Sequence, residues 1–188
     1  YTLSLDGKRT LRNITAENLG NDFSPRYSPD GRFIAYLRQT TRYFYADRQR
    51  IMLYDRASRQ HREITASLDR SCVNPLWSPD SQEIYFEAED QGYVRLYRVG
   101  ADGRKLLALT GQYSDRAAAL SRRGQCLVFL RSHFGLPPTL MALHLPDGEP
   151  RIIENLNRDL VSQWSLGFVD EVWFPGAEDR PVQMWVIY

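Results

Sequence analysis

The chain has few residues of the kinds that build reaction centres. It holds two cysteines and three histidines among 188 residues, and it lacks the Cys-x-x-Cys and His-x-x-x-His spacings of common metal sites. Cys72 and Cys126 are too few for a disulfide framework, so we expect two separate thiols packed in strands. The Gly-x-Ser-x-Gly elbow of serine hydrolases and a glycine-rich phosphate loop are missing too. The sequence therefore predicts no catalytic residues, no metal site and no cofactor in this chain.

The three histidines have no acidic and nucleophilic partners at recognisable spacings. His61 and His144 are expected on outer strands, where a solvated or capping role is the simpler interpretation. His133 lies in a Ser-His-Phe-Gly sequence that is typical of a turn. Acidic runs such as Glu87–Asp90 are typical of solvated hairpin tips.

Charge of one sign and long apolar runs are also lacking. The 24 basic and 23 acidic residues nearly cancel, so we expect no nucleic-acid partner. No apolar stretch approaches the ~20 residues that cross a bilayer, so we expect no membrane partner. A signal peptide is not recognised, and because the chain opens on Tyr1 we expect a piece of a longer protein. These features leave the compartment open; we favour a periplasmic or secreted location over a cytoplasmic one.

What the chain has instead is a repeated turn followed by a strand. The motif occupies Tyr27–Leu37, returns at Trp77–Phe86 and recurs in weaker form at Leu120–Leu130. In the turn, proline sets φ, aspartate bonds its own backbone and glycine accepts a positive φ. The apolar run that follows is typical of a strand covered on both sides. The spacings of fifty and forty-three residues match the ~40–50 residues of a four-stranded propeller blade.

The repeats predict an all-β chain that forms a partial β-propeller. We expect about three complete four-stranded antiparallel blades and a half blade at each end, over residues 1–175. Complete blades are predicted near 23–65, 72–110 and 115–156, an outer half blade over 1–15, an inner half blade over 160–175, and the start of a linker or strand over 176–188.

Several details follow from this scheme. A turn is expected at Asp6-Gly7, and Ala117–Leu120, despite a weak helical spacing, is interpreted as an inner strand. The last half blade should have strands near Leu160–Ser165 and Glu171–Phe174. Tyr27 and Trp77 should end equivalent inner strands. The strands of the first complete blade are predicted near Phe23–Ser28, Arg32–Arg38, Arg50–Asp55 and His61–Thr65.

Such a set of blades does not close a ring by itself. A blade buries its faces against its neighbours, so both ends should carry exposed apolar surface and unpaired edges. The two half blades would complete one another between two chains. We therefore expect the isolated chain either to form a homodimer that closes the ring or to aggregate.

The Ser-Pro-Asp-Gly repeats resemble the propeller of the prolyl-oligopeptidase family of serine peptidases. Stretches similar to its bacterial dipeptidyl-peptidase and acylaminoacyl-peptidase branch are Ala46–Arg56, Trp77–Asp80 with Tyr85–Asp90, and Pro175–Tyr188. The last resembles the join at which such enzymes enter their α/β-hydrolase domain. The resemblance implies that the nucleophile, acid and histidine lie in that further domain, and that the propeller limits the access of peptides to them.

The resemblance also implies that a propeller loop contacts the free N-terminus of the substrate through acidic residues. Within the insertion Gln39–Gln49, the stretch Thr40–Arg48 occupies the position of that loop. Relatives often have an acidic residue directly before Ala-Asp-Arg, where this chain has Tyr45, so Asp47 is the remaining candidate. A salt bridge from Asp47 to Arg48 or Arg50 is the structural alternative, which we favour. The candidate substrate-binding residues are Arg42, Tyr43, Tyr45, Asp47 and Arg48.

The sequence thus predicts a non-catalytic propeller fragment of a serine peptidase, with a peptide substrate and the hydrolase domain as partners. One alternative is a protein-interaction scaffold of the Tol-associated periplasmic type, which gives no reason for the final strand Val182–Tyr188. Another is a propeller enzyme with a site at the ring's centre. For that site the inner strands offer too few groups, namely Arg26, Asn74, Asp115 and Arg116.

Overall fold

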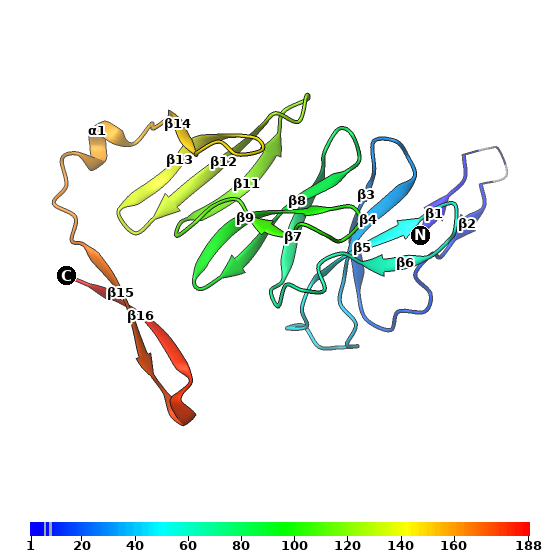
Figure 1. The fold of residues 1–188 in the computed structure, drawn as a ribbon, viewed down its shortest axis with the longest axis horizontal. Helices are drawn as coiled ribbons and strands as arrows, with labels where there is room; N and C mark the ends of the chain where they lie inside the picture. The colour runs from blue at the N-terminus through cyan, green and yellow to red at the C-terminus, as the bar shows by residue number, and fades with distance from the viewer. Residues whose placement is uncertain (6, 8) are drawn as a thin grey trace. The chain divides into compact units, whose positions relative to one another are not determined.

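The computed structural model describes residues 1–5, 7 and 9–188, and their regular structure is nearly all β (Figure 1). The chain has two compact units, each described below by itself: Tyr1–Tyr85 with Val99–Leu106, and Phe86–Arg98 with Leu107–Tyr188. Within the described residues no sheet closes on itself. The predicted all-β class is confirmed.

The first unit holds a two-stranded and a four-stranded antiparallel sheet. Their strands are β1 (Thr2–Leu3), β2 (Leu11–Arg12), β3 (Asp22–Tyr27), β4 (Phe33–Arg38), β5 (Arg50–Asp55) and β6 (His61–Glu63). Strands β3 to β6 pair in chain order, as in a propeller blade. The four predicted strands are confirmed, β5 with the same bounds. The turn predicted at Asp6-Gly7 includes Asp6, which lies outside the described residues.

The central strands β4 and β5 bury side chains on both faces. Every residue of 34–37 and 51–54 is buried, because consecutive apolar residues alternate between the two faces of a strand. On one face Ile34, Tyr36, Met52 and Tyr54 form a cluster against which Ile14 packs. The uninterrupted apolar run in the sequence therefore reflects a strand covered on both sides.

The repeated turn is held by its serine. Ser28 Oγ accepts a hydrogen bond from Phe33 N–H at 2.9 Å and donates one to Asp30 Oδ1 at 2.5 Å. Asp30 Oδ1 also accepts from Arg32 N–H at 3.0 Å. Gly31 has a φ of 71°, which glycine adopts without steric strain. The serine thus supplies an acceptor to the first N–H of the next strand.

The same serine contact closes the other two turns. Ser78 Oγ accepts from Glu83 N–H at 2.9 Å, and Ser121 Oγ accepts from Cys126 N–H at 3.0 Å. The third turn has Arg123 in place of aspartate, so its closure does not need the carboxylate. The serine contact is the shared physical basis of the repeat.

A further sheet has the strand order β7-β8-β9-β11-β12-β13-β14, with β10 also paired to β9. Its strands are β7 (Cys72–Trp77), β8 (Glu83–Asp90), β9 (Tyr93–Gly100), β10 (Leu107–Ala108), β11 (Ser114–Leu120), β12 (Cys126–His133), β13 (Leu136–His144) and β14 (Arg151–Glu154). Strands β11 to β14 pair antiparallel in chain order. Residues 117–120 are strand, as predicted, and Tyr27 and Trp77 each end their strand.

The inner strands share a residue of positive φ, at a bulge in two of them, that the sequence did not reveal. Ser24, Asn74 and Ala117 have φ values of 52°, 52° and 55°, and each precedes the last residue of its strand by three positions. On β3 and β11 the pairing register shifts at this place, as a β-bulge requires. Because the three residues are of different types, no residue pattern marks the bulge.

The strand predicted near Leu160–Ser165 is wrong, and a short helix, α1 (Arg158–Val161), lies there. The Ser162 hydroxyl and the Gln163 side-chain amide both donate to the Asp159 carbonyl, at 2.9 and 3.0 Å. Such local side-chain bonds to the backbone compete with strand pairing. The helix buries no residue, so packing does not enforce an extended chain.

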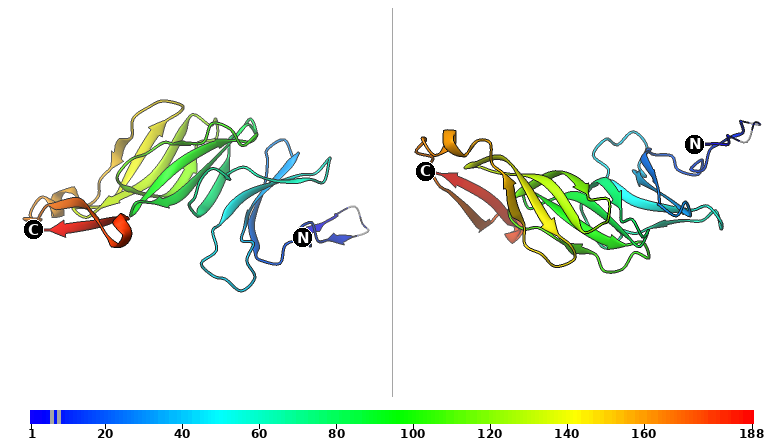
Figure 2. Two further views of the ribbon diagram at one scale, coloured as in Figure 1. Left: turned by 60° about the horizontal axis from the view of Figure 1, so that its bottom comes forward. Right: turned by 90° about the horizontal axis from the view of Figure 1, so that it is seen from above.

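The strand predicted near Glu171–Phe174 is confirmed within β15 (Val169–Pro175). Its partner is β16 (Pro181–Ile187), in the antiparallel hairpin drawn in orange-red and red in Figure 2. A short 3-10 turn, Ala177–Asp179, connects the two strands. The half blade predicted over 160–175 therefore has a different pairing, and the ring-closing dimer that would use it stays a prediction.

Candidate functional site

The long connection between β4 and β5, residues 39–49, is the candidate site and is called the aromatic loop below. Two successive turns build its tip, residues 41–46. Phe44 N–H donates to the Thr41 carbonyl at 3.4 Å, and Asp47 N–H donates to the Phe44 carbonyl at 3.2 Å. Adjacent antiparallel strands need as few as two connecting residues, so the sheet does not require a loop of this length.

Asp47 fastens the base of the aromatic loop. Its Oδ2 accepts hydrogen bonds from Thr40 N–H at 2.6 Å, Thr41 N–H at 2.9 Å and the Thr40 hydroxyl at 3.2 Å. Its Oδ1 lies 3.3 Å from Arg50 Nη1. Groups of the loop and of Arg50, the first residue of β5, therefore engage both carboxylate oxygens. Of the two ion pairs expected, with Arg48 or Arg50, the one with Arg50 is confirmed.

These contacts hold the Asp47 carboxylate in its charged form. Desolvation raises the pKa of Asp47, but hydrogen bonds from the Thr41 and Thr40 N–H groups and the charge of Arg50 together outweigh it and lower the pKa. The negative charge therefore bridges the two ends of the loop.

A buried glutamine holds the other side of the base. Gln39 Nε2 donates to the carbonyls of Tyr45 at 3.0 Å and Asp47 at 2.7 Å. The Gln39 carbonyl accepts from Asn18 Nδ2 at 3.0 Å. A Cβ added at Gly20 would lie 2.2 Å from the Gln39 carbonyl oxygen, so a larger residue there would displace the base. Sequence reasoning missed Gln39, because an amide after a strand has no distinctive pattern.

Arg48 also belongs to the base. Its Nη2 donates to Glu63 Oε1 at 2.9 Å, and its Nη1 donates to the Leu68 carbonyl. Of the predicted substrate-binding residues, Asp47 and Arg48 are therefore both engaged in contacts with neighbouring segments. Their binding of substrate stays a prediction.

The tip of the loop carries exposed aromatic side chains. The exposed fractions of Tyr43, Phe44 and Tyr45 are 89%, 54% and 97%. The Arg42 guanidinium lies over the Tyr43 ring, 4.6 Å from its centroid, a cation–π geometry. The structure thus places Arg42, Tyr43 and Tyr45 together at the tip and the other two candidates at the base.

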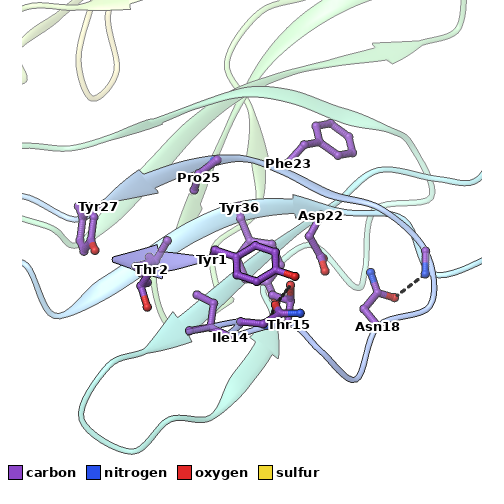
Figure 3. Close-up of a pocket in the computed structure, with 13 residues that line it drawn as sticks. Tyr1, Thr2, Ile14, Thr15, Asn18, Asp22, Phe23, Pro25, Tyr27 and Tyr36 are labelled. Carbon is purple, nitrogen blue, oxygen red and sulfur yellow. Dashed lines mark hydrogen bonds between the residues drawn. The ribbon is translucent and has the colours of Figure 1, made fainter. Parts of the chain in front are cut away.

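A hollow of about 350 Å³ lies beside the first hairpin and is lined in part by Tyr1, Ile14 and Tyr36 (Figure 3). Next to it His61 bridges two groups: Nε2 lies 2.8 Å from the Ile14 carbonyl and Nδ1 lies 2.8 Å from the Tyr36 hydroxyl. Because the carbonyl only accepts, we assign the proton to Nε2. Burial raises the pKa of Tyr36, so its hydroxyl stays protonated and donates to Nδ1. Of the solvated or capping role predicted for His61, the structure shows a bond that caps the Ile14 carbonyl.

Groups for metal or thiol chemistry are not assembled in the described part of the chain. Within residues 1–5, 7 and 9–188, no three His, Cys, Asp or Glu side chains lie where they could hold a metal ion. Burial raises the pKa of Cys72 to about 12, so this thiol stays protonated and unreactive. Over the same residues, no helix has the length and apolar character to cross a membrane.

The C-terminal hairpin is fastened to the β8–β9 turn within the second unit. Trp185 lies so close to Gly92 that a Cβ there would be 2.0 Å from the indole ring. Trp185 also meets the Tyr93 ring edge-on, with centroids 6.1 Å apart. Glu171 accepts hydrogen bonds from the Tyr93 hydroxyl at 2.8 Å and from Gln183 Nε2 at 3.0 Å. The hairpin is therefore held by ring contacts of Trp185 and by the hydrogen bonds of the Glu171 carboxylate.

No family model matches the chain. Dipeptidyl-peptidase 5 of Porphyromonas gingivalis is 24% identical over 187 residues, which cover all of this chain and 27% of that protein. Among solved structures, the acylaminoacyl peptidase of Pyrococcus horikoshii superposes with a TM-score of 0.70 at 19% identity, over 88% of this chain and 25% of that one. The chain is thus similar in sequence to a dipeptidyl-peptidase and in fold to an acylaminoacyl peptidase, which supports a propeller fragment of the prolyl-oligopeptidase type.

This propeller segment spans about a quarter of the length of the curated relative, 27% in the alignment above. A putative TolB of Agrobacterium tumefaciens superposes on it with a TM-score of 0.60 at 23% identity, over 75% of this chain and 51% of that one. Structural similarity at such identities establishes the fold, and the partial β-propeller predicted from the repeats is confirmed.

Proposed function

We propose that this propeller segment is part of a serine peptidase, in which an α/β-hydrolase domain cleaves peptides and the propeller governs which peptides reach it. One observation carries the proposal: the similarity to a dipeptidyl-peptidase runs over the whole chain, which corresponds to 27% of that protein's length. The rest of a protein of that size has room for a catalytic domain.

The C-terminal hairpin supports this assignment. An isolated two-stranded sheet is marginally stable, and this one leaves apolar side chains exposed that suit packing against further structure. The exposed apolar residues of the hairpin are Val172, Trp173, Phe174, Val182, Met184 and Ile187. A hydrolase domain that continues from β16 would cover them.

The aromatic loop is proposed to border the path of the substrate. It joins the second and third strands of its four-stranded sheet, β4 and β5. The turn that fastens the C-terminal hairpin joins the equivalent strands of the next repeat, β8 and β9. In a propeller, equivalent connections of successive blades open toward the same face. The loop would therefore face the catalytic domain.

In this scheme the chain's own residues bind and select substrates, and bond cleavage takes place elsewhere. Acyl transfer needs a nucleophile activated by a histidine that is oriented by an acid. The hydrolase domain would supply these three groups. The propeller would admit short or unfolded peptides and exclude folded proteins by size.

A scaffold that binds other proteins is the second candidate, and the structural similarity to TolB favours it. That superposition covers 75% of the chain, against 88% for the acylaminoacyl peptidase. The peptidase relative also aligns with the entire chain in sequence. We therefore prefer the peptidase.

Hydrolysis by two purified proteins tests the proposal. The full-length protein should cleave chromogenic dipeptide or acyl-amino-acid substrates, and the 188-residue chain alone should not. Replacing loop residues 41–46 by two glycines in the full-length protein should change KM or selectivity with little loss of thermal stability. A repurified 188-residue chain that still turns over substrate, or a full-length protein that cleaves nothing, would overturn the assignment.

A further inference from the structure

Arg42 is held in a geometry that leaves its hydrogen-bond donors free. Its guanidinium lies over the Tyr43 ring at 4.6 Å from the centroid. Stacking uses the flat face of the guanidinium, whereas its N–H groups point outward along the edge. A guanidinium held in this way presents paired donors that match the two oxygens of a carboxylate.

Arg42 differs from Arg48 of the loop and from Arg50, the first residue of β5, in having no carboxylate partner among the described residues. Arg48 pairs with Glu63 and Arg50 pairs with Asp47. Within the described residues no hydrogen bond or ion pair involves the Arg42 side chain, and the tip itself, residues 41–46, contains no acidic residue. The tip is therefore an exposed positive group among aromatic rings.

The backbone under this group is strained. Tyr43 has a φ of 61°, a region that bulky side chains seldom occupy. Such conformations persist where the surrounding structure enforces them, and they collect at ligand-binding sites. Here Tyr43 lies inside the turn that the hydrogen bond from Phe44 N–H to the Thr41 carbonyl closes at 3.4 Å. The strain is an observation independent of the free charge, and it concerns the residue on which Arg42 stacks.

We propose that Arg42, stacked on Tyr43, binds a carboxylate of the substrate peptide. The loop then selects peptides by a positive group and aromatic contacts, and it does not hold the substrate's N-terminal ammonium with Asp47, whose oxygens are both engaged. This inference rests on the proposed function, which brings the substrate to the loop. The carboxylate comes from an acidic side chain or from the free C-terminus of a short peptide.

The expected preference is modest. An exposed ion pair contributes little, because water and salt screen both charges. Stacking and a two-pronged contact increase the effect. We expect a substrate with the carboxylate to be favoured about five- to tenfold over its neutral analogue.

The test measures kcat/KM of the full-length protein for matched peptides. One series has Glu, Gln or Lys at each of the first three positions, and a second has a free or an amidated C-terminus. Preference for Glu assigns the carboxylate to a side chain, whereas loss of activity on amidation assigns it to the C-terminus. Arg42→Gln should abolish the preference, and Arg42→Glu should reverse it toward Lys.

Arg56→Gln is the matched control, since Arg56 also lies over a tyrosine, Tyr27, at 5.4 Å from the ring centroid. It should leave the preference unchanged. An active protein would overturn this inference and leave the proposed function standing if neither its Glu-to-Lys ratio nor its ratio of free to amidated C-terminus differed between the wild type, Arg42→Gln and Arg42→Glu.

If the full-length protein cleaves none of these peptides, a binding measurement tests the inference instead. In that case the proposed function fails first, and fluorescence anisotropy of labelled Glu- and Gln-containing peptides decides the inference separately. Tighter binding of the Glu peptide that Arg42→Gln removes would support the carboxylate site. Equal binding of the two peptides, together with equal binding of peptides with a free and an amidated C-terminus, would refute it.

Discussion

The base and the tip of the aromatic loop lie a few residues apart and behave in opposite ways. At the base, Asp47, Gln39 and Arg48 each make two or more polar contacts, within the loop or with neighbouring segments. At the tip, Tyr43 and Tyr45 are almost fully exposed. The difference indicates a division of labour, in which the base determines the shape of the loop and the tip is free to meet another molecule.

This contrast also explains why a charged residue is a poor guide to function by itself. Asp47 has the residue type expected of a binding group, yet its hydrogen bonds serve the loop. Arg42 has no carboxylate partner in the described chain, and its charge remains available. A charged group that is already paired stabilises the fold. An unpaired charged group at an exposed and strained position is the better candidate for binding a substrate.

The largest effect should come from removing the carboxylate at the base. Asp47→Ala leaves two N–H groups and Arg50 without their acceptor, so we expect a loss of about 2–3 kcal/mol in the free energy of unfolding. Urea unfolding at pH 7 measures it. Asp69→Ala, at an exposed aspartate, is the control and should cost less than about 0.5 kcal/mol. A loss as small as the control's would mean that the base contacts do not hold the loop.

The contribution of Asp47 should also depend on pH. Its folded-state pKa is lowered by the N–H groups of Thr41 and Thr40 despite desolvation, whereas the unfolded value is about 3.9. The folded state then binds fewer protons between these values. The stabilisation is complete above about pH 4 and falls as the pH drops below it. The stability gap between the wild type and Asp47→Asn, followed from about pH 6 to about pH 2.5, should therefore narrow; a constant gap would contradict the assignment.

Substitutions at the tip should have the smallest effects on the free energy of unfolding. Some should raise it and others should lower it. Tyr43→Gly relieves a positive φ, so it should stabilise the fold by up to about 1 kcal/mol relative to Tyr43→Ala. Tyr45→Ala should stay within about 0.5 kcal/mol of the wild type. Thermal unfolding at one protein concentration compares the three variants. A strongly destabilised Tyr45→Ala would show that the tip is part of the folded core, and the contrast with the base would disappear.

Much of the fold could be predicted because its signals are local. The Ser-Pro-Asp turn places its donors and acceptors within five residues, so the bounds of β4 and β5 follow from the turn and the apolar runs. Tyr27 and Trp77 end equivalent strands for the same reason. Their surroundings differ, however: Trp77 stacks on Phe33 with centroids 6.4 Å apart, whereas Tyr27 is largely exposed.

The parts that could not be predicted depend on contacts between distant residues. The positive-φ positions Ser24, Asn74 and Ala117 have no common residue type. The helix at 158–161 forms because no partner strand competes for that segment. At the candidate site the sequence predicted where the loop lies and that Asp47 pairs with either Arg48 or Arg50. It did not separate base from tip, because that separation depends on Gln39 and on Glu63 of a different strand.

The serine turn has a consequence for the order of folding. The contact between Ser28 and Phe33 closes over five positions, whereas that between His61 and Ile14 spans 47. Hairpins form within about 1–10 μs, and contacts between distant residues follow more slowly because they close larger loops. The β3–β4 hairpin would thus be paired before the segments around it arrive. Early pairing shortens the time for which strand edges are open to wrong partners, which is the chief hazard for a chain made of similar repeats.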